Sequence, residues 1–204
     1  MKFLIIGVVV YLAIAFPMPA LSQTVISNDN LLFGSNFGDF GFTAYQDAAA
    51  SDYTGVAFSY NGTTVSPFFV NADEGSDWYV VQPGDVFSME TIAAGEFTPL
   101  LTFGPIFHPP ARVGSGDFYL GVNTGRGSDI PDDRTVFGWV HLRRVFGAVT
   151  MIENVMSYDS PGIIIGTTTV VPEPETWILV LGVCIACAAS IRTRSRPRLI
   201  RRCS

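Results

Sequence analysis

Hydrophobic and polar residues alternate in short runs along most of the chain, with a period of two. Val56, Phe58 and Tyr60 fall on one face of such a run. Turn signals recur at intervals of about ten residues, among them Asn61-Gly62 and Pro83-Gly84-Asp85. No long stretch between residues 23 and 171 has helical periodicity. Many short strands at this spacing predict an all-β domain, an antiparallel β-sandwich or jelly-roll.

The expected strands follow from the alternation and from the turn residues between them. They are Leu31–Phe33, Gly41–Tyr45, Gly55–Tyr60, Thr64–Val70, Trp78–Gln82, Val86–Ile92, Pro99–Phe103, Asp117–Asn123, Arg134–Arg143, Ala148–Tyr158 and Gly162–Thr169. Only Asp47–Asp52, with three consecutive alanines, is a candidate for a helical turn.

One expected strand shows both of its faces clearly. The first face is aliphatic and the second carries aromatic and basic side chains, which predicts a strand packed on at least one side. The aliphatic face has Val136, Val140 and Leu142, and the opposite face has Phe137, Trp139, His141 and Arg143.

The N-terminal 22 residues have the pattern of a secretory signal peptide. Met1-Lys2 is a short basic start, Phe3–Phe16 is apolar, and Ala20-Leu21-Ser22 offers the small residues that precede a cleavage site. We therefore expect cleavage between Ser22 and Gln23. An uncleaved anchor is the alternative, because prolines at positions 17 and 19 are unusual there.

A second apolar segment, Trp177–Ile191, lies near the C-terminus and carries no charge. As a helix rising roughly 1.5 Å per residue it spans about 22 Å, less than the roughly 30 Å hydrocarbon core, so it is a short transmembrane helix. Arginines after it predict a cytoplasmic side by the positive-inside rule. These are Arg192, Arg194, Arg196, Arg198, Arg201 and Arg202. A buried core helix is the alternative, but the segment has no polar stripe.

Pro172-Glu173-Pro174 precedes this segment, and the three parts together resemble the PEP-CTERM sorting signal of Gram-negative bacteria. Family members usually have Ser or Thr directly after the motif, whereas this chain has Glu175 and then Thr176. The resemblance implies that exosortase, a membrane protease-transpeptidase, binds the motif and cleaves near it. It also implies a polysaccharide-producing host, which makes exopolysaccharide a further candidate partner.

The charge of the part between the two apolar ends is strongly negative. Of 18 acidic residues all but Glu173 and Glu175 lie between Gln23 and Val171, against five of 12 basic residues, a net charge near −11. Such a surface repels nucleic acid. The cysteines lie at positions 184, 187 and 203, so residues 23–171 have no disulfide or thiol chemistry.

Motifs for catalysis are absent from the sequence. His108 and His141 are its two histidines, and no nucleophile elbow, zinc-binding His-Glu-x-x-His or phosphate-binding loop accompanies them. The glycine-rich Gly121–Gly127 does not lead into a helix, so it is no dinucleotide site. We predict no enzyme, no cofactor and no metal site.

Two acidic segments, Asn71–Asp77 and Asp129–Asp133, contain oxygen ligands that suit Ca²⁺. Neither has EF-hand spacing, and an acidic protein places carboxylates in solvated turns in any case. We expect diffuse cation attraction there and no specific site.

The sequence predicts a signal peptide at 1–22, an exported domain at 23–171 and a sorting signal at 172–204. The protein is then held at the inner membrane by its C-terminal helix until processing releases it to the cell surface or extracellular matrix. One alternative is a tail-anchored periplasmic protein without processing. Another is a secreted carbohydrate-binding or hydrolytic domain whose surface aromatics would be Trp78, Tyr79, Trp139 and Tyr158.

Overall fold

The computed structural model describes residues 24–34, 38–71, 75–102, 106–124 and 135–172. Within these ranges most residues lie in strands, and every pairing between strands is antiparallel. The expected all-β class is confirmed. The expected signal peptide and C-terminal helix lie outside the described residues. Among the described residues, no helix has the length and apolar character needed to cross a membrane.

The strands are β1 (Val25–Ser27), β2 (Leu31–Gly34), β3 (Phe40–Tyr45), β4 (Tyr53–Tyr60), β5 (Thr64–Val70), β6 (Ser76–Val81), β7 (Val86–Ser88), β8 (Thr98–Thr102), β9 (Ile106–Phe107), β10 (Ala111–Arg112), β11 (Asp117–Thr124), β12 (Val136–Val145), β13 (Ala148–Tyr158) and β14 (Gly162–Ile164). A short helix, α2 (Met89–Ala93), follows β7.

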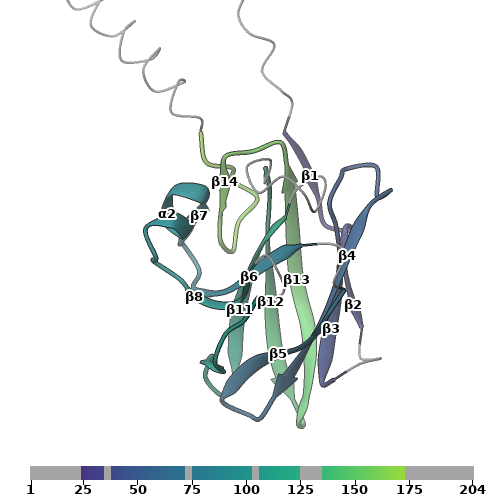
Figure 1. The fold of residues 1–204 in the computed structure, drawn as a ribbon, viewed down its shortest axis with the longest axis vertical. Helices are drawn as coiled ribbons and strands as arrows, with labels where there is room; N and C mark the ends of the chain where they lie inside the picture. Colours follow the sequence, from purple (N-terminus) through teal and green to yellow (C-terminus); the bar gives the residue numbers. More distant parts are fainter. Residues whose placement is uncertain (1–23, 35–37, 72–74, 103–105, 125–134, 173–204) are drawn as a thin grey trace, which may run out of the picture.

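Two sheets stack against each other along the length of the domain (Figure 1). The first has five strands in the order β10-β5-β4-β3-β2, and the second has seven in the order β1-β13-β12-β11-β6-β8-β9. Strands β2 to β5 and β11 to β13 are sequential neighbours, because short turns allow antiparallel strands to pair directly. Inward side chains of both sheets form one hydrophobic core.

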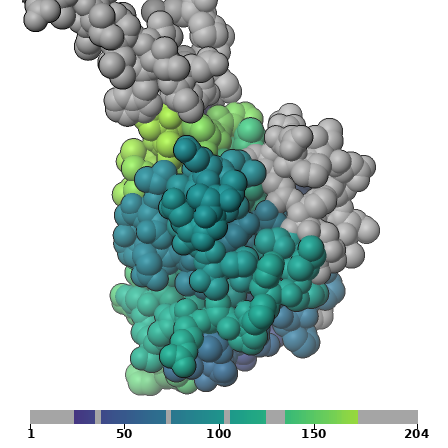
Figure 2. Space-filling model, turned by 60° about the vertical axis from the view of Figure 1, so that its left-hand side comes forward, coloured from purple at the N-terminus to yellow at the C-terminus, as the bar shows by residue number. Residues whose placement is uncertain are grey.

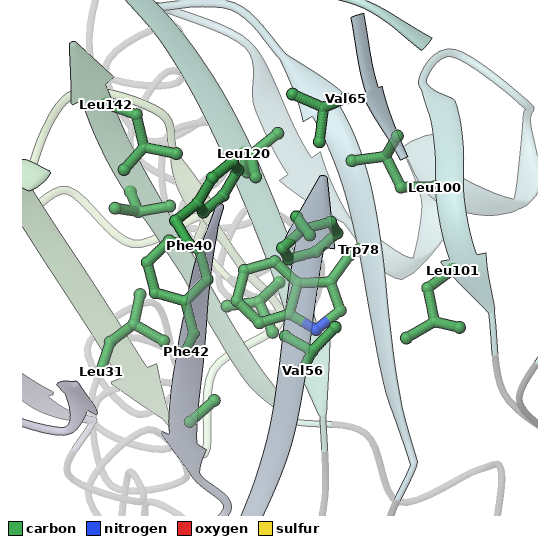
Figure 3. Close-up of a cluster of buried hydrophobic side chains, with 14 of the residues drawn as sticks. Leu31, Phe40, Phe42, Val56, Val65, Trp78, Leu100, Leu101, Leu120 and Leu142 are labelled. Carbon is green, nitrogen blue, oxygen red and sulfur yellow. The ribbon is translucent and has the colours of Figure 1, made fainter. Parts of the chain in front are cut away.

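Aromatic side chains dominate the centre of this core (Figure 3). Trp78 of β6 is fully buried and stacks on Phe42 of the opposite sheet, with ring centroids 5.1 Å apart. The edge of Phe58 meets the same indole at 5.4 Å. The indole N–H donates to the Ser76 hydroxyl at 2.8 Å, so this polar atom is satisfied despite its burial.

A smaller third layer covers part of the outer face of the seven-stranded sheet. It consists of β7, β14 and α2, and Figure 2 shows its teal and yellow-green residues on this side of the molecule. The Phe87 ring of this layer packs closely against Gly121. A Cβ on that glycine would lie only 3.0 Å from the Phe87 ring, so a larger residue would not fit there. The second face of β12 is therefore buried too, with Trp139 donating to the Thr167 carbonyl at 2.9 Å.

The predicted strand Val86–Ile92 is wrong in its second half. The strand ends at Ser88, and the helix begins at Met89. Ser88 caps the helix, because its side chain accepts from the Thr91 backbone N–H while the Thr91 side chain accepts from the Ser88 N–H. This pair of capping hydrogen bonds starts the helix and so ends β7 at Ser88.

The candidate helical turn at Asp47–Asp52 is a tight turn and no helix. Ala50 donates its N–H to the Asp47 carbonyl at 3.2 Å and takes a positive φ of 55°. The Asp47 carboxylate accepts from the Ser51 backbone N–H at 2.9 Å and from its hydroxyl. These side-chain bonds compete with a helix and favour the turn.

Candidate functional site

The predicted sorting motif begins where the folded domain ends. Val170 forms the last bridge, to Ile163, and Val171 donates its N–H to the Gly162 carbonyl at 2.9 Å. Pro172 follows and is exposed. The other predicted sorting and cleavage residues lie outside the described residues: Ser22, Gln23, Glu173, Pro174, Arg192, Arg194, Arg196, Arg198, Arg201 and Arg202.

Both ends of the described domain lie at the same end of the stacked sheets, at the top of Figure 1. The N-terminal end is held by Val25, which pairs with Tyr158 near the end of β13. The C-terminal end is held by the bridge between Val170 and β14. A segment before Val25 and a segment after Pro172 therefore begin from one side of the domain.

The two histidines lie in different surroundings. The Nε2 atom of His108 lies 2.9 Å from the Thr102 hydroxyl, between β8 and the turn after β9. His141 stacks on Tyr119, with ring centroids 4.4 Å apart and planes 7° from parallel. Among the described residues no group of three His, Cys, Asp or Glu side chains is placed to hold a metal ion.

A polar cluster surrounds His141 on the outer face of the seven-stranded sheet, because β11 and β12 pair there in register. Arg143 donates to Asp117 through Nε at 2.7 Å and through its terminal nitrogen at 2.8 Å. The Nε2 atom of His141 lies 3.2 Å from the same carboxylate without the geometry of a hydrogen bond. Hydrogen bonding by Arg143 lowers the pKa of Asp117 to about 2.

We predict that this ion pair makes stability depend on acid pH. The pKa of Asp117 is lower in the folded protein than the ordinary 3.8, so its contribution is present above about pH 4 and is lost as the pH falls towards 2. Urea unfolding between pH 2 and 6 should show Asp117→Asn less stable than the parent at pH 6, with a difference in the free energy of unfolding that shrinks as the pH falls to 2. Glu96→Gln, an exposed control, should show no such convergence. A difference between parent and Asp117→Asn that is constant over this range would contradict the prediction.

The four aromatics considered for sugar binding are not at the surface. Trp78 and Trp139 are fully buried, and Tyr79 and Tyr158 are 6% and 3% exposed. Burial raises the pKa of Tyr158 to about 12, and its hydroxyl donates to the Tyr45 carbonyl at 3.2 Å. The alternative of a sugar-binding surface built from these side chains is therefore excluded, because all four belong to the hydrophobic core.

A shallow groove instead lies on the outer face of the five-stranded sheet. Its volume is about 440 Å³, within the roughly 300–1,000 Å³ of small-ligand sites. None of the described residues that line it is charged: Leu32, Phe33, Gly34, Gly41, Phe42, Thr43, Tyr53, Gly55, Val56, Ala57, Phe69 and Asn71. We call this the sheet groove.

Strand register brings several small residues together on the floor of the sheet groove. One outward row across β2, β3 and β4 is Leu32, Thr43 and Gly55. The next row across these strands is Gly34, Gly41 and Ala57, and it continues to Phe69 on β5.

Larger side chains rise around this floor. Tyr53 and Phe69 are 50% and 51% exposed, and Leu32 is 48% exposed on the edge strand. The Tyr53 ring packs edge to face with the Tyr45 ring, and the two ring centroids lie 6.3 Å apart. The groove thus has a floor of sheet residues, and the half-exposed Tyr53, Phe69 and Leu32 side chains stand around it.

Searches against protein-family models, curated proteins and solved structures found no match to this chain. The resemblance of the C-terminal segment to the PEP-CTERM signal stays a prediction from the sequence.

Proposed function

We propose that this protein is an exported, non-enzymatic β-sandwich that is sorted through its C-terminal segment and delivered to the cell surface or extracellular matrix. The shared core of the two stacked sheets supports the sandwich architecture. The proposed partner is an exosortase-type membrane protease-transpeptidase, and the C-terminal helix holds the protein at the inner membrane before processing.

The observation that carries the proposal is the position of Pro172. The last backbone hydrogen bond of the described domain is made by Val171, and Pro172 is exposed immediately after it. Proline fixes φ near −65° and disfavours helix in the residue before it. Two prolines in the motif, at positions 172 and 174, therefore favour an extended peptide after the domain, which would suit a protease that binds its substrate as an open chain.

The positions of the domain ends support the same topology. A signal peptide before Gln23 and a helix after Thr176 would both start at the membrane on the exported side. Because both ends of the described domain lie at one end of the stacked sheets (Figure 1), the two segments would reach the same membrane without crossing the fold.

Replacing Pro172, Glu173 and Pro174 together with alanine should abolish C-terminal processing. The triple variant should keep the mass of a chain that ends at Ser204 and stay in the membrane fraction, while the parent loses its tail. Thr168→Ala is the matched control, since Thr168 is exposed and precedes the motif by a few residues. Processing of the triple variant at the parental rate would contradict the proposal. Retention of Arg192–Ser204 in the parent itself would favour the unprocessed tail anchor.

A further inference from the structure

We propose that the sheet groove is a binding site for a neutral carbohydrate chain. The site lies on the outer face of β2, β3, β4 and β5, and it differs from the buried aromatics that the sequence suggested. The inference does not depend on how the protein is exported or processed.

Two of the three glycines of the floor, Gly34 and Gly55, point to a ligand. The third, Gly41, is required by packing, because a Cβ there would lie 2.7 Å from the Val56 carbonyl oxygen. A glycine inside a strand costs roughly 0.5–1 kcal/mol relative to alanine and often marks a place where a ligand approaches the backbone. A Cβ placed on Gly55 or Gly34 meets no atom within 4 Å, and neither residue has a positive φ. Packing and backbone conformation therefore do not require glycine at these two positions, whereas an open floor does.

The size of the floor suits a flat ring. Adjacent strands lie about 4.8 Å apart and alternate residues about 6.8 Å apart, so two rows across three strands leave a patch of roughly 10 by 7 Å. Four of the six positions of this patch are glycine or alanine, so a pyranose ring can lie on it with one face against these small residues. Tyr53 and Phe69 stand beside it, and the C–H groups of a sugar face pack well on aromatic rings.

Hydroxyl groups in the groove match the polar edge of a sugar. The hydroxyls of Thr43 and Tyr53 make no hydrogen bond within the described ranges of the chain, although both residues line the groove. A hydroxyl can both donate and accept, as can each hydroxyl of a sugar. Asn71 brings an amide to the β5 side of the groove.

The charge of the groove and of the domain favours a neutral carbohydrate chain over an acidic one. The lining, as far as the structure describes it, has no basic residue that could pair with a carboxylate or sulfate. The net charge near −11 of residues 23–171 repels polyanions as well. A protein partner fits less well, because specific interfaces bury about 800 Å² on each side around a packed hydrophobic centre, and this groove is shallow with a glycine floor.

The test is calorimetric titration of the full-length protein in a detergent without a sugar headgroup. The probes are cellohexaose, xylohexaose, mannohexaose and maltohexaose, with hexagalacturonate as the anionic comparison. We expect at least one neutral hexasaccharide to bind and hexagalacturonate not to bind. Gly55→Val should weaken that binding at least tenfold, because its side chain fills the floor, while the melting temperature stays equal or rises, since valine favours strands.

Two matched controls separate the groove from general surface effects. Gly116→Val also projects into open space, outside the groove, and should bind as the parent does. Phe107→Ala removes a ring that is 50% exposed on β9 and should also bind normally, whereas Tyr53→Ala should lose at least tenfold. Absence of binding to every neutral probe would overturn the proposal, as would equal binding by the parent, Gly55→Val and Tyr53→Ala. The parent could instead form a dimer that Gly55→Val abolishes. This result would assign the groove to contact with a second copy of the chain and would also overturn the proposal.

Discussion

Replacing Trp78 with alanine should lower the free energy of unfolding by about 3–5 kcal/mol. The indole is fully buried between the two sheets, stacked on Phe42 and met by the edge of Phe58. Its removal leaves a cavity that rigid strands on both sides cannot close. It also takes away the donor that the buried Ser76 hydroxyl now accepts from.

Urea or guanidinium unfolding followed by circular dichroism measures this loss. Phe107→Ala is the control, because it deletes a large aromatic ring from an exposed position, where substitutions usually change stability by about 0.5 kcal/mol or less. Similar losses for the two variants would contradict the account of the core.

Gly138→Val should cost about 3 kcal/mol, at the upper end of the usual range for overpacking. A Cβ at this position would overlap the Met156 sulfur and lie 2.8 Å from the Val155 carbonyl oxygen. The methionine side chain can move, but the carbonyl belongs to the β12–β13 ladder and cannot. Relief of the contact therefore requires the two strands to separate.

The same unfolding measurement distinguishes this effect from a general intolerance of valine. A Cβ on Gly116 would point into open space, with no atom within 4 Å, so Gly116→Val should stay close to the parent. Gly138→Ala should already be destabilised, because the first added carbon makes the contact. Parental stability of Gly138→Ala would show that β12 and β13 do not approach as described.

Most of the strands could be predicted because their pattern is local. Val56 and Phe58 point to the core as the alternation indicates, and β12 presents its two predicted faces to two different cores. The pattern does not predict the short edge strands β1, β9 and β10, since two or three residues carry too little periodicity. It does not predict the third layer either, because Phe87 and Ile163 come from segments far apart in the sequence.

The groove and the polar cluster depend on strand register, which the sequence does not state. Gly34, Gly41 and Gly55 are visible as glycines, but only the pairing of β2, β3 and β4 makes them one floor. Asp117 and Arg143 likewise meet because β11 and β12 pair at that position. The sequence alone does not decide between sugar-binding and core aromatics. Alternation places Trp139 on one face with Phe137 but does not show that a further layer covers that face.

The intact mass of the protein recovered from the envelope and medium of its host tests the central claim most directly. The proposed export and sorting predict a chain that begins near Gln23 and ends close to Pro172-Glu173-Pro174, without the apolar segment and the arginine tail. Recovery of a single species that still contains Arg192–Ser204 would contradict the account.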